Sequence, residues 1–192
     1  GDDITTNVKT IKNLPHKIPH HGPLRVRAEI LLPKSARKNL NNSREKSGLP
    51  PFANTRNAAA GSIKLLDSRE VARRELQIFC YEILQNSITQ TQKEIFQKFS
   101  ERGLPIFNRL EHHDSITEIQ KICADPTTKT FFENQDLDFD GLVLKINEIS
   151  VQNTLGSTDH HPRRAIAFKF PAQLARTELL GIERQVGRSG VI

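Results

Sequence analysis

Alternating apolar and polar residues predict a β-strand over Leu24–Leu32. Every second residue of this run is apolar, and Arg25, Arg27 and Glu29 lie between them on the opposite face. Such alternation is typical of a strand with one buried face. Further strands are predicted over Gln77–Leu84, Asp140–Ile146, Ala165–Phe170 and Glu178–Val186, with a returning strand over Arg188–Ile192.

Helical patterns lie between these strands. Thr89–Arg102 is amphipathic, with Ile95 and Phe96 facing inward and Gly103 closing the helix. Residues 1–22 contain several prolines and are predicted to be irregular. A helix is predicted over Arg56–Leu66, with an N-cap at Asn54 or Thr55 and a potential break at Gly61. The other predicted helices cover Lys34–Lys46, the residues from Asp114 or Ser115 to about Ala124, and a short turn at Gln152–Leu155.

The strands and helices follow no regular βαβ repeat. This order favours an α+β fold of mixed, largely antiparallel sheets with flanking helices over a doubly wound parallel sheet. A chain of 192 residues suits one sizeable domain or two small ones. Residues 1–184 are interpreted as one domain, and residues 185–192 as the start of a connection to another.

The charge balance favours a polyanionic partner. Lysine and arginine number 28 against 22 acidic residues, a formal net charge of +6. An excess of this kind suits DNA or RNA. No apolar run approaches the length of about 20 residues needed to span a bilayer, so a soluble, cytoplasmic protein without a membrane partner is expected.

Cysteine and histidine spacing gives little support for a metal site. Cys80 and Cys123 are far apart with no C-x-x-C motif, so each is expected to be packed in the fold. The pairs His20-His21, His112-His113 and His160-His161 lack a zinc-ligand spacing. The chain contains no methionine and opens on Gly1, which indicates processing or a piece of a longer protein.

Two lysines with apolar neighbours are the main candidates for chemistry. Lys145 lies between Leu144 and Ile146, and Lys169 between Phe168 and Phe170. Such a lysine either extends its ammonium to solvent or meets an anion. Two on neighbouring strands predict a phosphate clamp, because fixed cations stabilise charge on a transferring phosphate.

Four other residues have both a structural and a functional interpretation. Arg56 begins a predicted helix, where it is either solvent-exposed or near a bound anion. Glu29 either forms a surface ion pair, or accepts hydrogen bonds from a ribose or holds a metal. Tyr81 is expected to line the core, the alternative being stacking on a base. Asp140 precedes Gly141, which marks a bulge or a close backbone approach.

Taken together, these motifs resemble the adenylation (nucleotidyltransferase) domain of bacterial NAD-dependent DNA ligases. The resemblance covers nearly the whole chain and is most specific in Phe-Ala-Asn-x-Arg-Asn-Ala-Ala-Ala-Gly-Ser at Phe52–Ser62. The other segments that carry it are Asp3–Ile11, Arg27–Glu29, Phe79–Tyr81, Asp140–Lys145, Phe168–Pro171 and Gln185–Arg188. It implies a nucleotidyltransferase, ATP-grasp-like domain that is N-terminally truncated.

The resemblance implies sealing of nicks in duplex DNA, in repair and replication in the bacterial cytosol, with NAD and magnesium. A lysine is adenylated by NAD, the AMP passes to a 5′-phosphate, and a 3′-hydroxyl displaces it. By position, Lys145 and Lys169 would contact the AMP phosphate as catalytic residues. Glu29 would contact the ribose and Tyr81 the adenine. Arg56 and Lys64 would bind DNA, and Asp140 would lie near the metal.

Several features depart from the family pattern. The Lys-x-Asp-Gly motif that carries the nucleophile is absent, and the zinc finger and the other N- and C-terminal ligase domains are not in these residues. Ala28, Lys64 and Arg164 replace a usual glycine, arginine and tryptophan. The chain alone is therefore expected to be inactive. Alternatives are a residual nucleic-acid-binding module and one part of a split ligase.

Overall fold

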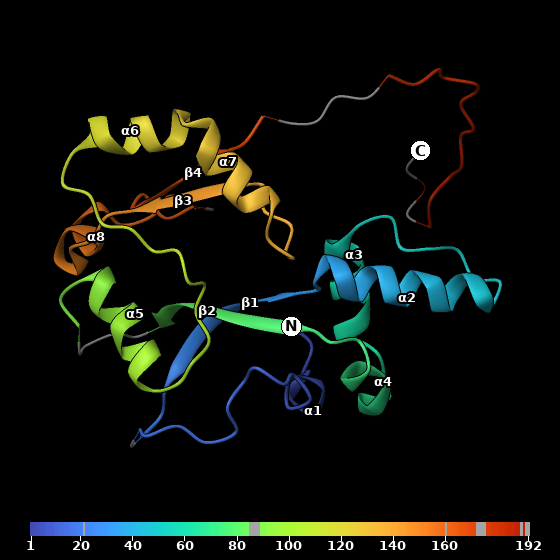
Figure 1. Ribbon diagram of the computed structural model, residues 1–192, viewed down its shortest axis with the longest axis horizontal. Coiled ribbons are helices and arrows are strands. Elements are labelled where there is room, and N and C mark those ends of the chain that lie inside the picture. The colour runs from blue at the N-terminus through green and yellow to red at the C-terminus, as the bar shows by residue number, and fades with distance from the viewer. Residues whose placement is uncertain (21, 85–88, 160, 172–175, 189, 191–192) are drawn as a thin grey trace.

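Two small antiparallel sheets, each with helices beside it, form the protein (Figure 1). The structure is a computed structural model that describes residues 1–192 except 21, 85–88, 160, 172–175, 189 and 191–192. Strand β1 (Arg25–Leu31) pairs with β2 (Gln77–Leu84), and β3 (Gly141–Lys145) pairs with β4 (Ala165–Lys169). The predicted α+β class with antiparallel strands is therefore confirmed.

The first sheet packs against the N-terminal helices. These are α1 (Thr5–Val8), α2 (Lys34–Lys46), α3 (Thr55–Ile63) and α4 (Ser68–Ala72). Helix α3 begins where the sequence predicts, because the Asn54 side chain accepts a hydrogen bond from the Asn57 N–H at 2.8 Å. Gly61 does not break it. The buried core beneath this sheet includes Ile11, Leu32, Ala58, Val71 and Ile78.

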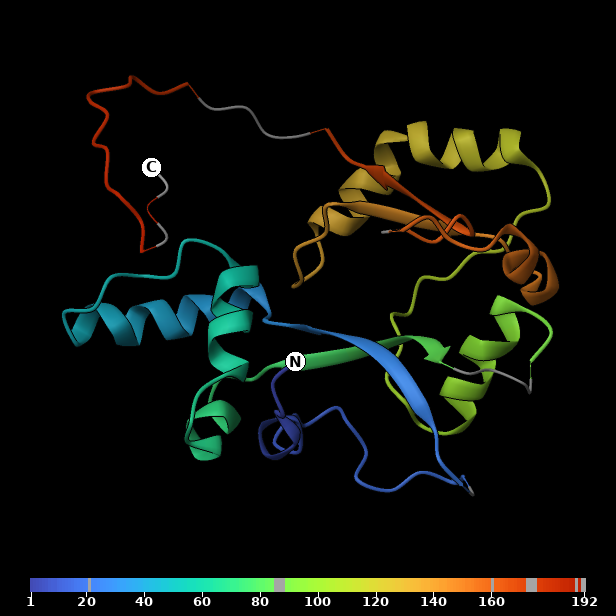
Figure 2. The same cartoon turned by 180° about the vertical axis from the view of Figure 1, so that it is seen from behind.

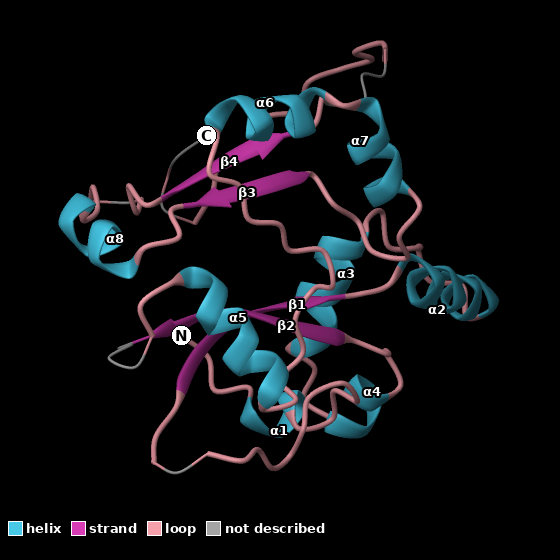
Figure 3. Ribbon diagram, turned by 60° about the vertical axis from the view of Figure 1, so that its left-hand side comes forward, coloured by secondary structure: helices cyan, strands magenta, loops and turns pink. Residues whose placement is uncertain are grey.

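The second sheet is covered by later helices. Figure 3 shows α6 (Ile116–Ala124) and α7 (Pro126–Glu133) over one side of β3–β4, with β1–β2 beyond the other side. Helix α5 (Gln92–Glu101) packs on β2 around Ile95 and Phe99, and α8 (Ile149–Leu155) follows β3. Gly103 closes α5 in the left-handed region, with a φ of 68°.

A β-bulge at Tyr81 interrupts the pairing of β1 with β2. Arg27 lies opposite Glu82 and Ala28 opposite Cys80, so Tyr81 has no partner across the sheet. The extra residue shifts the alternation of side chains, so that Glu82 joins Arg27 on the outer face and not Cys80 on the core face. Tyr81 is 37% exposed. The expectation that Tyr81 lines the core is therefore wrong.

Burial separates the two cysteines. Cys80 is buried, and desolvation raises the pKa of its thiol to about 11. Cys123 is half-buried, and desolvation raises its pKa as well. Both thiols are free. Packing is therefore confirmed for Cys80 and is only partial for Cys123.

Several local predictions differ from the structure. Residues 1–22 contain α1, whose Asn7 is buried and donates to the carbonyl oxygens of Ile63 and Leu65 at 2.8 Å. The short helices α4 and α7 were not predicted. Helix α5 is capped by Thr91, so it begins later than the predicted start at Thr89. No helix in the described part of the chain has the length and apolar character to cross a membrane.

The predicted final strand is wrong where the structure describes it. Residues Glu178–Val186 form no strand, and Figure 2 shows these residues, in red, running apart from both sheets. A strand needs a neighbour to satisfy its backbone groups, and this segment lies beside none. Its return at Arg188–Ile192 lies partly outside the described residues, as do His21 and His160 of the histidine pairs.

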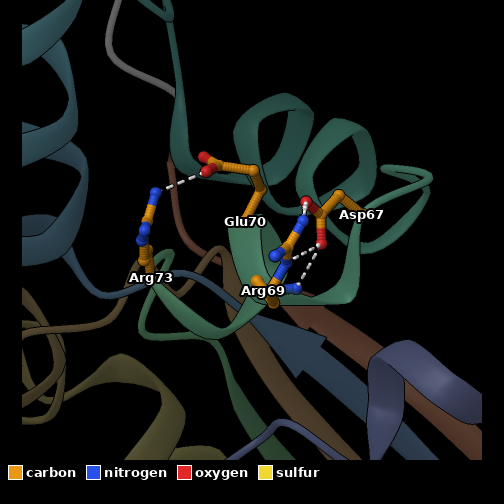
Figure 4. A network of polar contacts seen from close by, with 4 residues as sticks. All are labelled: Asp67, Arg69, Glu70 and Arg73. Atoms are coloured by element: carbon orange, nitrogen blue, oxygen red, sulfur yellow. Dashed lines mark hydrogen bonds and ion pairs between the residues drawn. The ribbon is translucent and has the colours of Figure 1, made fainter.

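Ion pairs on the surface of α4 engage its arginines locally (Figure 4). Asp67 caps the helix by accepting from the Arg69 N–H at 2.9 Å, and its carboxylate also pairs with the Arg69 guanidinium. Glu70 pairs with Arg73 at 2.5 Å. Hydrogen bonds from Arg69 lower the pKa of Asp67. These arginines therefore have carboxylate partners and do not form a free cationic patch.

Candidate nucleotide site

The two candidate lysines lie on the same face of the β3–β4 ribbon. Gly141 is opposite Lys169 and Lys145 is opposite Ala165, and residues directly opposite share a face in an antiparallel pair. Odd-numbered residues of both strands therefore lie together. The predicted placement of Lys145 and Lys169 on neighbouring strands is confirmed, although whether they bind phosphate stays a prediction.

Gly141 lets the two strands approach closely. A Cβ atom placed on it would lie 2.0 Å from the Phe168 carbonyl oxygen and 2.8 Å from the Lys169 Cα. Both are backbone atoms of β4, so no side-chain movement can relieve the overlap. The close approach predicted for this glycine is confirmed.

Lys145 is half-buried at the junction of the two sheets. Its Nζ donates to the Tyr81 carbonyl oxygen at 3.2 Å and lies 5.2 Å from the centroid of the Tyr81 ring. Desolvation lowers the pKa of Lys145, and the neighbouring Arg164 lowers it further, whereas the Glu82 carboxylate raises it. The ammonium is thus a partly dehydrated cation held beside an aromatic ring, a setting that strengthens attraction to an anion.

Glu82 is the carboxylate that joins the two sheets beside Lys145. It accepts from Arg27 of β1 at 3.1 Å and forms a short ion pair with Arg164, the residue before β4. The Glu82 side chain is only 17% exposed. The sequence interpretation did not select Glu82.

Lys169 and Asp140 form an exposed ion pair at the other end of the ribbon. The Lys169 Nζ lies 2.6 Å from the Asp140 carboxylate. This hydrogen bond lowers the pKa of Asp140, desolvation opposes the effect, and the charge of Arg56 lowers the pKa slightly further. The charge of Arg56 from α3 therefore acts at the same end of the ribbon as Asp140 and Lys169.

The loop before Asp140 is tied to the starts of two helices. Lys34 of α2 donates from Nζ to the carbonyl oxygen of Gln135 in this loop at 2.8 Å and to that of Glu133, the last residue of α7, at 2.9 Å. The buried Thr55 of α3 donates to the Asp138 carboxylate at 2.6 Å. Because Arg56 follows Thr55, these contacts position Arg56 relative to Asp140. Only the tertiary structure reveals these positioning residues.

The remaining predicted residues lie at the edges of this arrangement. Glu29 is exposed on the outer face of β1, and the described residues make no hydrogen bond to its carboxylate. Lys64 ends α3 and pairs with Asp2 at 2.8 Å, with both side chains mostly exposed. The structure thus brings together Tyr81 with Lys145, and Asp140 with Lys169 and Arg56. It does not bring Lys64 to either group.

The described residues do not form a metal site by themselves. They contain no cluster of three or more His, Cys, Asp or Glu side chains that could hold an ion. Asp140 offers one exposed carboxylate that is already paired with Lys169. Magnesium is commonly bound by one or two carboxylates together with substrate phosphates. The metal role of Asp140 stays a prediction, and no step below is assigned to a metal.

Comparison with known proteins matches this arrangement to one family. The model of the NAD-dependent DNA ligase adenylation domain matches residues 1–173. DNA ligases from Carboxydothermus hydrogenoformans, Rickettsia canadensis and Petrotoga mobilis are 43%, 42% and 40% identical to the chain over its full length. The chain spans 28–29% of the length of these relatives.

Proposed function

The chain belongs to the family of NAD-dependent DNA ligase adenylation domains, and on that premise we propose that it binds the adenylate part of NAD. The observation that carries this proposal is the placement of Lys145 and Lys169 on one face of β3–β4, with the Lys145 ammonium half-buried beside Tyr81. Two cations on one face suit the phosphate of AMP. Glu29, whose carboxylate is unpaired among the described residues, would accept hydrogen bonds from the ribose hydroxyls.

The proposed reaction is the joining of nicked duplex DNA in three transfers. A lysine amine attacks the α-phosphorus of NAD and displaces nicotinamide mononucleotide. The AMP then passes to the 5′-phosphate at the nick, and the 3′-hydroxyl displaces AMP to form the phosphodiester. In each transfer Lys145 and Lys169 would stabilise the negative charge that develops on the phosphate oxygens. Arg56 and Lys64 would contact the DNA backbone.

Wider features of the family are proposed on the same premise. Asp140 would hold magnesium, which would offset negative charge on the substrate phosphates. The fold would be of the nucleotidyltransferase, ATP-grasp-like type, and other ligase domains would complete the enzyme. Its setting would be replication and repair of bacterial cytosolic DNA. The low coverage of the relatives supports a multidomain protein.

Adenylate binding by the 192-residue chain tests the proposed function directly. Isothermal titration with AMP and with NAD is expected to show saturable binding of both. AMP is the sharper probe, since it contains only the part of NAD that the proposed site contacts. Absence of AMP binding at millimolar concentration would contradict the proposal.

Covalent adenylation of the chain alone is expected to fail. The 192 residues contain no Lys-x-Asp-Gly motif, so the attacking amine of the family reaction is missing from them. Incubation with NAD labelled in the adenylate and with magnesium should leave no covalent AMP adduct, as measured by intact mass without exposure to acid, which would cleave a lysyl–AMP bond. A stoichiometric gain of the mass of AMP would show that another lysine acts as nucleophile.

A second candidate function is nucleic-acid binding without catalysis, which the exposed Arg56 and the net charge of +6 favour. Arg56→Ala is expected to weaken binding to a nicked duplex at low salt about threefold to tenfold and to reduce the salt slope by about one. Fluorescence anisotropy over a salt series measures both. Arg69→Ala is the matched control, because Asp67 already pairs with that guanidinium. Equal losses in the two variants would remove the specific role of Arg56.

A further inference from the structure

The bulge at Tyr81 places a second charged residue at the nucleotide site. In a regular strand, Glu82 would lie on the same face as Cys80, which is buried in the core. The unpaired Tyr81 shifts the register, so Glu82 lies opposite Arg27 on the outer face. Bulges commonly re-aim side chains next to functional sites. Here the re-aimed side chain is a carboxylate whose neighbour in sequence, Tyr81, accepts the hydrogen bond from Lys145.

The Glu82 carboxylate is shared by two guanidinium groups from different sheets. Arg27 reaches it from β1 and Arg164 from the residue before β4. Arg164 stands where the resemblance expects tryptophan. An arginine at this position adds a cation beside Lys145, which disfavours the charged form of Lys145. Glu82 provides the compensating negative charge.

We propose that Glu82 is a positioning residue for Lys145: held by Arg27 and Arg164, the Glu82 carboxylate keeps the Lys145 ammonium charged and directed at the bound phosphate, against the opposing charge of Arg164. This role rests on the proposed adenylate binding. The balance of these charges would set the upper pH limit of that binding, because the phosphate attracts Lys145 only while Lys145 carries its proton.

The groups that face Lys145 determine the sign of each effect. Strand β2 contributes the Glu82 carboxylate and Tyr81, and the segment before β4 contributes Arg164. Strand β1 contributes Arg27 through its pair with Glu82. Glu29 lies on the same outer face of β1 as Arg27. Removing the charge of Glu82 lowers the pKa of Lys145, whereas removing the charge of Arg164 raises it. A role limited to joining the sheets would give both variants the same effect, since each breaks the same ion pair.

The experiment compares Glu82→Gln with Arg164→Gln in the 192-residue chain. The side-chain carbon resonance next to the Lys145 amine is followed by NMR from about pH 7 to 11, and is assigned with Lys145→Arg. AMP affinity is measured over the same range. Glu82→Gln is expected to bind AMP about threefold to tenfold more weakly than the wild type near pH 10 and within about twofold near pH 7. Arg164→Gln is expected to retain binding to a higher pH than the wild type.

Each outcome bears on a separate claim. Opposite shifts of the Lys145 titration in the two variants, matched by the AMP profiles, support the positioning role. Shifts in the same direction, or none while AMP still binds, would overturn that role and leave the proposed function intact. A wild-type chain whose Lys145 titrates but which binds no AMP would overturn the proposed function. Circular dichroism of both variants checks that the fold is retained.

Discussion

Gly141→Ala is expected to separate β3 from β4 and to lower the free energy of unfolding by about 3 kcal/mol or more. The added methyl carbon would lie 2.0 Å from the Phe168 carbonyl oxygen, far inside van der Waals contact. Since the nearest atoms belong to the backbone of β4, relief requires the strands to move apart and lose ladder hydrogen bonds. Urea unfolding followed by circular dichroism measures the change.

Gly61→Ala is the matched control for this substitution. Gly61 lies within α3, and a Cβ atom on it would meet nothing within 4 Å. Alanine in a helix interior is more stable than glycine by roughly 0.5–1 kcal/mol, so this variant should be slightly stabilised. The two identical chemical changes are thus expected to have opposite signs. A Gly141→Ala protein within about 1 kcal/mol of the wild type would show that the ribbon tolerates a wider strand spacing.

Lys145→Met is expected to weaken AMP binding by about tenfold to a hundredfold, the contribution of a hydrogen bond to a charged group. The half-buried ammonium meets less competing water than that of Lys169, which is exposed and paired with Asp140. Lys169→Met should therefore have a smaller effect. Calorimetric titration with AMP near neutral pH gives the affinities. Lys121→Met on the exposed surface of α6 is the control and should bind as the wild type does.

Stability should move opposite to binding in Lys145→Met. Desolvation lowers the pKa of Lys145 in the folded chain below the value in the unfolded chain. Between these two values the unfolded state binds more protons, so stability rises with pH as Lys145 loses its proton. At neutral pH the charge therefore costs stability, and the uncharged methionine should leave the protein at least as stable as the wild type. A variant that loses both binding and stability would contradict this separation of roles.

Local patterns were sufficient for most elements. The bounds of α2 and β2 match their predicted ranges, and β1 lies within its predicted range. The β1 range alternates and ends at Pro33, the α2 range ends shortly before Gly48, and the β2 range is rich in apolar and aromatic residues. The helix α7 was missed although Asp125 caps it and Pro126 occupies its first turn, a sequence signal that favours a helix start. The final strand at Glu178–Val186 was wrong, because strand propensity does not supply a pairing partner.

Some residues of the candidate site could be predicted from local sequence patterns, and others could not. Apolar neighbours identified Lys145 and Lys169, and the glycine in a predicted strand identified Gly141, before the pairing of β3 with β4 was known. Glu82 was not selected, and its face in the folded chain depends on a single unpaired residue, Tyr81. The register shift arises from the pairing of β1 with β2. A bulge of this kind leaves no clear mark in the alternation of one strand.

The sequence by itself determined the family, most of the helices and strands, and the two candidate lysines Lys145 and Lys169. These depend on local periodicity and on short motifs, which act over a few residues. Only the tertiary structure decided which polar groups meet. Lys145 contacts the Tyr81 carbonyl oxygen, Arg164 pairs with Glu82, and Asp140 pairs with Lys169. These partners are 29 to 82 residues apart in the chain. Strand register and the bulge bring them together, because both depend on contacts between segments that no local pattern records.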